Sequence, residues 1–191
     1  MNIKSQICCF SGHRPTKLPF GYDETHPSCL RLKAALFGEA GRLREEGVTT
    51  FLSGMAQGTD MIAAEIVLDM RRAYPGNNIR LVAVVPYEGQ ADRWSIEYRE
   101  RYFNILSKAD EVMTLRKRYT DSCMQERNRY MVNASAHLVA VCGGAGGGTR
   151  YTVDYAIKKG LEVIIINPDT LKREHIPSPG PLVSFTNRFL R

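Results

Sequence analysis

The sequence of 191 residues lacks most of the features that mark membrane, secreted and metal-binding proteins. No apolar run approaches the roughly 20 residues that a membrane-spanning helix requires, and the first residues contain no long apolar segment of the signal-peptide kind. The five cysteines are odd in number and form no CxxC pair, which argues against a disulfide framework or a zinc site. We therefore expect a cytoplasmic protein with reduced, buried thiols, no membrane segment and no bound metal.

Several common enzyme motifs are missing as well. The first predicted strand is not followed by GxGxxG, which argues against an ordinary NAD-dependent dehydrogenase. No GxxxxGK[ST] segment indicates a Walker-type NTPase, and no GxSxG segment marks a hydrolase nucleophile. No basic arm is present, although the net charge of +6 favours anionic partners such as nucleotides, nucleic acid or an acidic protein.

What the chain does contain is an alternation of strand and helix patterns. Helical spacing of apolar residues fills the intervals between short apolar runs, with Gly47 and Gly160 as stop signals. The runs predict strands near Ile7–Phe10, Thr49–Leu52, Leu81–Val85, Glu111–Leu115, His137–Val141 and Val163–Ile166. This alternation predicts an α/β fold, namely a Rossmann-like, doubly wound parallel sheet of about six strands with helices on both faces.

One domain accounts for nearly all of this pattern. We expect residues 1–168 to form a single nucleotide-binding domain, because a chain of this length suits one α/β unit. Residues 169–191 contain several prolines and little periodicity. We predict that they form an extended C-terminal tail that packs on the domain or is partly disordered.

The strongest candidate for a binding site is the glycine-rich loop that follows the fifth predicted strand. In an open parallel sheet, ligands bind beyond the carboxyl ends of the strands. Glycines let the backbone approach an anion closely and adopt left-handed dihedral angles, and the N–H groups at the start of the next helix then face a phosphate. We therefore predict phosphate binding by Gly143, Gly144, Gly146, Gly147, Gly148 and Thr149, with Thr149 also able to cap the helix.

Two further segments lie at strand ends, one after the first strand and one after the second. Asp60 begins a helix, where it either caps the helix or contacts a ligand. His13 is a phosphate contact, an acid–base group or a solvated loop residue, and Arg14 offers a planar fork that suits phosphate. The candidate ligand-binding residues of these segments are Gly12, His13, Arg14, Ser53, Gly54, Gly58 and Asp60.

Together these segments resemble the YpsA-like proteins of the SLOG superfamily. The resemblance is carried by four stretches in the same order along the chain, Cys8–Pro15, Ser53–Asp60, Cys123–Val132 and Gly147–Ala156. The superfamily is Rossmann-like and includes the DNA-processing protein DprA and the Lonely Guy cytokinin-activating hydrolases. The resemblance implies that the protein binds a nucleotide-derived ligand.

A helix of the Lonely Guy enzymes reads Met-x-x-Arg-Lys, and Met124–Asn128 is similar to it. The resemblance implies that Arg127 takes the role of their substrate-binding and catalytic arginine. Arg127 stands three residues after Met124, at the margin of an apolar helix face, so we expect its head group in the ligand crevice. The glutamate that follows their glycine loop is missing, because Tyr151 and Thr152 stand there instead.

The first of three functional hypotheses is a binding protein, a sensor or carrier of a phosphate-bearing nucleotide derivative. The phosphate would lie on the glycine loop, with Arg127 and Arg14 as its charge partners. Trp94 and Tyr87 lie nearest a strand end and are able to stack on a base. No cofactor other than this ligand is expected.

The other two hypotheses are an enzyme and a nucleic-acid-binding protein. A nucleotide N-glycosidic bond hydrolase of Lonely Guy type would use Arg127 with Asp154, Asp60 or Glu65 as its carboxylate. DprA-like binding of single-stranded DNA would draw on the basic cluster Arg116–Tyr119. A homo-oligomer is compatible with all three hypotheses.

Overall fold

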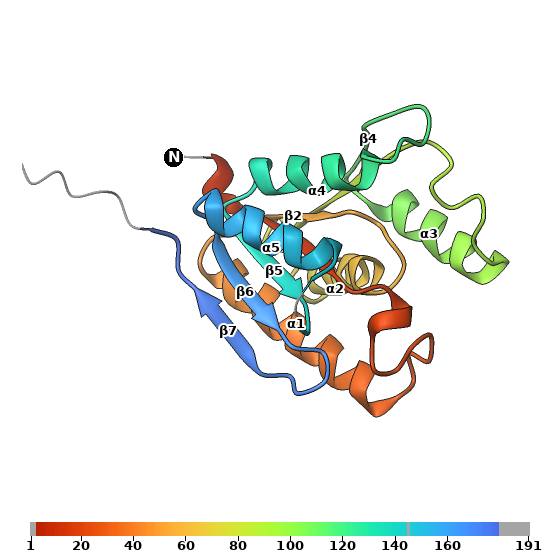
Figure 1. Ribbon diagram of the computed structural model, residues 1–191. Coiled ribbons are helices and arrows are strands. Elements are labelled where there is room, and N and C mark those ends of the chain that lie inside the picture. Colours follow the sequence, from red (N-terminus) through yellow and green to blue (C-terminus); the bar gives the residue numbers. More distant parts are fainter. Residues whose placement is uncertain (1–2, 145, 180–191) are drawn as a thin grey trace, which may run out of the picture.

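The computed structural model describes residues 3–144 and 146–179 and has one sheet at its centre (Figure 1). The order of the strands is β4-β3-β2-β1-β5-β6-β7. All neighbouring pairs are parallel except β6 and β7, which run antiparallel. The strands are Ile7–Gly12 (β1), Thr50–Ser53 (β2), Arg80–Val85 (β3), Glu111–Thr114 (β4), His137–Val141 (β5), Glu162–Ile166 (β6) and Arg173–Ile176 (β7). The prediction of a Rossmann-like, mainly parallel α/β fold is confirmed.

Helices cover both faces of the sheet, as predicted. Figure 1 shows α4 and α5 on one side and α1 and α2 on the other. The described α-helices are Pro27–Glu45 (α1), Thr59–Ala73 (α2), Ile96–Lys108 (α3), Cys123–Ala134 (α4) and Gly148–Lys158 (α5), and the 3₁₀ turns are Ile3–Gln6 and Pro15–Lys17. Within the described ranges, no helix combines the length and the apolar character that crossing a bilayer requires.

Two hydrophobic clusters lie on the two faces, and β1 contributes to both of them. Cys8 and Phe10 pack with residues of α1, α2 and α3, whereas Cys9 packs with residues of α4 and α5. Successive side chains of a strand point to opposite faces, so a strand covered on both sides is apolar at every position. All five cysteines are free and buried.

Beyond residue 168 the chain adds a strand that the sequence pattern did not predict. Residues Arg173–Ile176 form β7, which pairs with β6 from Ile166 opposite Arg173 to Val163 opposite Ile176. The described sheet therefore has a seventh strand, and it continues past the boundary predicted at residue 168. The sequence of β7 contains no apolar run because three of its four residues are exposed at the sheet edge. Residues 180–191 of the predicted tail lie outside the described residues.

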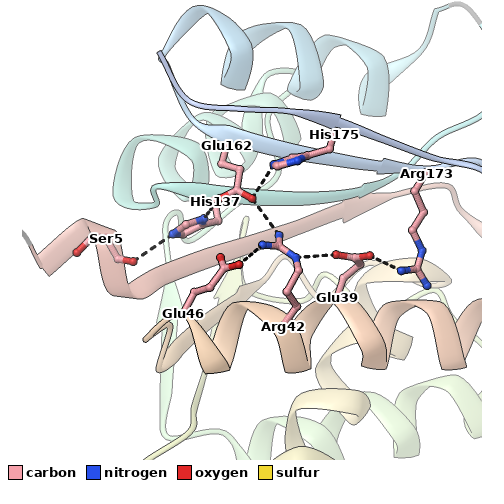
Figure 2. Close-up of polar contacts among 8 residues, drawn as sticks. All are labelled: Ser5, Glu39, Arg42, Glu46, His137, Glu162, Arg173 and His175. Carbon is pink, nitrogen blue, oxygen red and sulfur yellow. Dashed lines mark hydrogen bonds and ion pairs between the residues drawn. The ribbon is translucent and has the colours of Figure 1, made fainter. Parts of the chain in front are cut away.

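A network of ion pairs connects the amino end of β6 to β5, β7 and α1 (Figure 2). Glu162 Oε1 accepts a hydrogen bond from Arg42 at 2.9 Å and lies 2.8 Å from His175 Nε2. Glu162 Oε2 lies 2.9 Å from His137 Nδ1. Burial by itself raises the pKa of Glu162, but the hydrogen bonds from Arg42 and His137 outweigh it and hold the pKa below its ordinary value.

A second carboxylate extends this network along α1 to the edge strand. Glu39 is buried within α1 and accepts from Arg42 Nε at 3.2 Å and from Arg173 Nη1 at 2.6 Å. Because Arg173 belongs to β7, the two carboxylates Glu39 and Glu162 together hold the antiparallel strand against α1 and β6.

We predict that Glu162→Gln lowers the free energy of unfolding by about 1–3 kcal/mol, because one amide cannot accept hydrogen bonds on both sides and the partly buried donors Arg42 and His137 lose a charged partner. Denaturant unfolding followed by circular dichroism measures the difference. The matched control is Glu45→Gln, since the side chain of Glu45 is 72% exposed and an exposed ion pair contributes little. Equal stability of the two variants would contradict the role given to Glu162.

The loss of stability in Glu162→Gln should also depend on pH. The pKa of Glu162 is lowered in the folded state, so its contribution to stability is present above the ordinary carboxyl pKa and is lost as pH falls through the folded pKa. The stability difference between the wild type and Glu162→Gln should therefore be largest near neutral pH and shrink in acid.

Candidate functional site

A cleft of about 270 Å³ lies beyond the carboxyl ends of β1 and β5. These strands are neighbours at the point where the strand order reverses, which is where open α/β sheets bind ligands. The cleft is bounded by the loop after β1, the start of α2, one side of α4 and the start of α5. Its lining residues are Ser11, Gly12, His13, Arg14, Thr16, Lys17, Ala56, Asp60, Met124, Arg127, Asn128, Gly146, Gly147, Gly148 and Thr149.

The glycine-rich loop presents the start of α5 to this cleft. Gly144, Gly146 and Gly147 have φ values of 73°, 92° and 92°, which side chains other than glycine rarely adopt. Gly147 is the N-cap of α5, so Thr149 lies inside the first turn and does not cap the helix. The backbone N–H groups of this first turn have no intrahelical partner, and the helix dipole makes this end positive.

His13 holds one side of the glycine loop. Its Nε2 accepts a hydrogen bond from Gly143 N at 3.0 Å, and its carbonyl oxygen accepts two from Thr59, from N at 3.2 Å and from Oγ1 at 3.1 Å. Burial lowers the pKa of His13, and an Nε2 that accepts a hydrogen bond must be unprotonated. A neutral His13 therefore joins β1, α2 and the loop after β5, and acidification opposes this contact.

The first turn of α5 is held from the other side by α4. Thr152 Oγ1 donates to the carbonyl oxygen of Gly148 at 2.9 Å and accepts from Asn128 Nδ2 at 2.9 Å. The position of the loop therefore depends on side chains from β1 and α4 as well as on its own glycines.

A buried ion pair forms the floor of the cleft. Arg127 donates from Nη1 to Asp60 Oδ2 at 3.1 Å and to the carbonyl oxygen of Gly54. Arg127 is 4% and Asp60 is 5% exposed. Burial raises the pKa of Asp60, while Arg127 and the N–H of Ala56 favour its charged form. Arg127 thus lines the cleft with its head group buried, which agrees with the prediction that this head group points into the crevice.

Three of the predicted ligand-binding glycines are required by close contacts within the chain. A Cβ atom on Gly12 would lie 2.4 Å from Thr59, one on Gly54 would lie 1.6 Å from Arg127 Nη1, and one on Gly58 would lie 2.7 Å from the carbonyl oxygen of His13. Gly12 also lines the cleft, whereas Gly54 and Gly58 do not. Glycine at these positions lets the strand ends and the loop after β1 pack closely against α2 and α4, which is a different reason from approach to a ligand.

Ser53 does not line the cleft, but its hydroxyl group holds the turn between β2 and α2. Its hydroxyl donates to the carbonyl oxygen of Asp60 at 2.7 Å and accepts from Met55 N at 3.2 Å. Met55 is in the left-handed region with φ of 56°, and Gln90 Nε2 donates to its carbonyl oxygen at 2.6 Å. These bonds fix the turn that presents Asp60.

Two of the predicted carboxylates lie elsewhere. Asp154 is 56% exposed at its side chain and pairs with Arg150 at 2.9 Å, one turn earlier in α5. Glu65 accepts two hydrogen bonds from Arg101, at 2.8 and 2.6 Å. Among the described residues Asp60 is therefore the one carboxylate that lines the cleft.

Lys17 is a lining residue that the sequence reasoning missed. It ends the 3₁₀ turn Pro15–Lys17, and its ammonium nitrogen lies 3.4 Å from the position that a Cβ atom on Gly147 would occupy. The signal that could have identified it is its place three residues after Arg14, in the loop that was already a candidate.

The predicted basic cluster Arg116–Tyr119 carries less free charge than its sequence suggests. Arg116 pairs with Glu126 at 2.6 Å, which reduces the charge that this cluster offers to nucleic acid.

The described residues contain no group of three or more His, Cys, Asp and Glu side chains arranged to hold a metal ion. The charged groups that line the cleft are instead three cations and one paired carboxylate, beside neutral polar side chains and the backbone N–H groups at the start of α5. This arrangement suits an anionic ligand.

A doubly wound sheet with a cationic cleft at its switch point defines a Rossmann-like protein. The family model YpsA, described as the YspA SLOG family, matches residues 8–171, and the chain belongs to this family. A similar protein is the SPbeta prophage-derived YoqJ of Bacillus subtilis, 29% identical over 159 residues that cover 75% of this chain and 92% of YoqJ. A UPF0398 protein of Bacillus cereus is 30% identical over 158 residues, covering 81% of this chain and 84% of that protein.

Solved structures of DNA processing protein A share the fold. That of Streptococcus pneumoniae has a TM-score of 0.54 at 15% identity, covering 93% of this chain and 51% of that chain. That of Helicobacter pylori, described with its single-stranded DNA binding mode, has a TM-score of 0.57 at 15% identity and covers 86% of this chain and 66% of that chain. This chain thus spans about half to two thirds of the length of these proteins.

We predict that Gly54→Ala lowers the free energy of unfolding by about 1–3 kcal/mol, because the added methyl group overlaps the guanidinium of Arg127. Thermal or denaturant unfolding measures the loss. Gly76→Ala is the control, since nothing in the described structure lies within 4 Å of its added Cβ atom. If Gly54→Ala proves as stable as Gly76→Ala, the position given to Arg127 is wrong.

Proposed function

We propose that this protein binds a phosphate-bearing, nucleotide-derived ligand in the cleft at the ends of β1 and β5, as a sensor or carrier of that ligand. The observation that carries the proposal is the start of α5, whose first-turn N–H groups open onto the cleft through the loop Gly146–Thr149. Backbone N–H groups at a helix N-terminus are a recurrent way of binding phosphate. Membership of the YspA SLOG family agrees with a nucleotide-related role.

The charges around the cleft support an anionic ligand. Its lining residues include the cations Arg14, Lys17 and Arg127 and the single carboxylate Asp60. Because Arg127 pairs with Asp60, Arg14 and Lys17 remain to neutralise the charge of a phosphate. Both lie on the loop after β1 and are exposed, so their side chains are able to turn toward a ligand.

We predict that Gly147→Val abolishes binding of AMP, because a branched side chain is strained at φ of 92° and fills the space above the loop. Lys17→Ala should weaken binding by about tenfold, the effect of losing about 1.4 kcal/mol of charge-assisted hydrogen bonding. Isothermal titration calorimetry measures both effects.

Lys108→Ala removes the same charge from the exposed last turn of α3, which does not line the cleft, and should bind AMP as the wild type does. Wild-type affinity in Gly147→Val would remove the glycine loop from the site. A loss in Lys108→Ala equal to that in Lys17→Ala would show that only the overall charge matters.

Hydrolysis of a nucleotide N-glycosidic bond is a second candidate, favoured by one observation. Asp60 lies in the cleft, and burial raises its pKa, as is common for carboxyl groups that act as acids or bases. Against this, Asp60 already pairs with Arg127, and Asp154 and Glu65 lie outside the cleft. A binding role therefore ranks above hydrolysis.

We expect the wild type to release little or no free base from nucleoside monophosphates, as measured by chromatography after long incubation. Robust release that disappears in Asp60→Asn but persists in Asp154→Asn, with both variants folded by circular dichroism, would establish the hydrolase instead. Asp154→Asn is the suitable control because it removes an exposed carboxylate of the adjacent helix.

A further inference from the structure

We infer that His137 is a proton-dependent latch that holds the 3₁₀ turn Ile3–Gln6 against the sheet. The latch is closed while the imidazole carries a proton on both ring nitrogens, and it opens at the turn when pH rises and one proton is lost. It lies at the amino ends of the strands, whereas the proposed ligand cleft lies at their carboxyl ends. The inference is therefore independent of the proposed function.

The geometry shows that each ring nitrogen of His137 faces an oxygen that accepts hydrogen bonds. Nδ1 lies 2.9 Å from Oε2 of Glu162, and Nε2 lies 3.1 Å from the carbonyl oxygen of Ser5 (Figure 2). Burial opposes the charged form of Glu162, but hydrogen bonds from Arg42 and His137 outweigh it and lower the pKa, so this group is an ionised acceptor near neutral pH. A neutral imidazole has one N–H group and an imidazolium has two. Both contacts therefore exist together only when His137 is charged.

The charges of the surrounding network favour this imidazolium. The permanent charges drawn in Figure 2 are two guanidinium groups, those of Arg42 and Arg173, and three carboxylates, those of Glu39, Glu46 and Glu162. The two cations leave one negative charge of the network unmatched. A charged His137, whose side chain is 15% exposed beside Glu162, supplies the missing cation.

The other titratable groups of the elements around the imidazole do not take over its role. Cys8 is the partner of His137 in the pairing of β1 with β5, and burial raises the pKa of its thiol well above the ordinary value, so it is neutral. His175 in β7 lies 2.8 Å from Glu162 through Nε2, and a neutral ring with its proton on Nε2 is enough for that contact. Lys4 is the charged residue of the turn itself.

Loss of one proton breaks the contact with the turn rather than the contact with β6. A hydrogen bond to a carboxylate is stronger than one to a neutral carbonyl group, so the remaining proton stays on Nδ1, facing Glu162. Nε2 then turns a lone pair toward the carbonyl oxygen of Ser5, and the two repel. Histidine ordinarily changes its charge between about pH 5 and 8. The contact is therefore present at lower pH and is lost as pH rises.

The turn has little else that is buried to hold it in place, so the latch controls its position. Ile3, Lys4 and Ser5 are exposed, and Gln6 is half-buried. Ile3 and Gln6 form one wall of a second cavity, of about 230 Å³, at the amino ends of β1 to β4. The opposite wall includes Leu52 and Val82 of the sheet. Release of the turn therefore uncovers an apolar part of the sheet.

The test is cleavage by trypsin after Lys4, within the turn. Proteolysis requires local opening of the chain, so the rate reports release of the turn. Division by the rate for a synthetic peptide of residues 1–10 at the same pH removes the pH dependence of trypsin itself. We expect the normalised rate to rise about tenfold from about pH 6 to about pH 9. Cleavage after the buried Arg127, which reports global unfolding, should not rise with it.

Two variants, checked by circular dichroism at both pH values, assign the effect to one histidine. His137→Asn retains a donor for Glu162 but is too short to reach Ser5, so it should be cleaved at the fast rate at both pH values. His175→Asn is the matched control, because it removes an imidazole that faces the same carboxylate and should keep the wild-type rise. A wild-type rate that does not change with pH would overturn the inference. A rise that persists in His137→Asn, or disappears in His175→Asn, would overturn it as well.

Nitrogen NMR of histidine-labelled protein tests the protonation state directly. We expect His137 to carry protons on both ring nitrogens at about pH 6 and on Nδ1 alone at about pH 9. A bare ring nitrogen on His137 at about pH 6 would contradict the latch even if the turn opens with pH. The same measurement on His137 in the folded Glu162→Gln variant should show one bare nitrogen already at the lower pH, since the charged partner is gone.

Discussion

The buried pair of Arg127 and Asp60 is the contact on which the rest of the cleft depends. It joins α4 to the turn between β2 and α2, and the guanidinium also binds the carbonyl oxygen of Gly54. Removing two charges from water is costly unless each finds good partners. That cost explains why residue 54 is glycine, since any side chain there would displace the guanidinium.

The two ends of the sheet use charge in different ways. At the amino end of β6, the carboxylate of Glu162 is surrounded by Arg42, His137 and His175, and the network fastens α1 and β7. At the carboxyl ends of β1 and β5, exposed cations remain beside free helical N–H groups. The first arrangement is satisfied internally and stabilises the fold. The second has capacity left for an anion, which is why a ligand site is assigned to that end.

The glycine loop shows how a flexible sequence acquires a defined position. Glycine permits the positive φ values of residues 144, 146 and 147 but does not select them, because it accepts many other conformations as readily. The selection comes from outside the loop, where His13 holds Gly143 and Thr152 holds Gly148. The loop is therefore positioned by its neighbours, and the neutral state of His13 is part of that positioning.

The sequence by itself determined the alternation of strands and helices, because apolar runs covered on both faces and glycine stops are local signals. It also placed the glycine loop, His13 and Arg127 at one edge of the sheet. It missed β7, whose exposed residues carry no apolar pattern, and it missed Lys17. Only the tertiary structure decided that Asp60 faces the cleft while Asp154 and Glu65 do not. All three begin or lie within helices, and which side of a helix meets a neighbouring strand end depends on packing between distant segments, which no local pattern records.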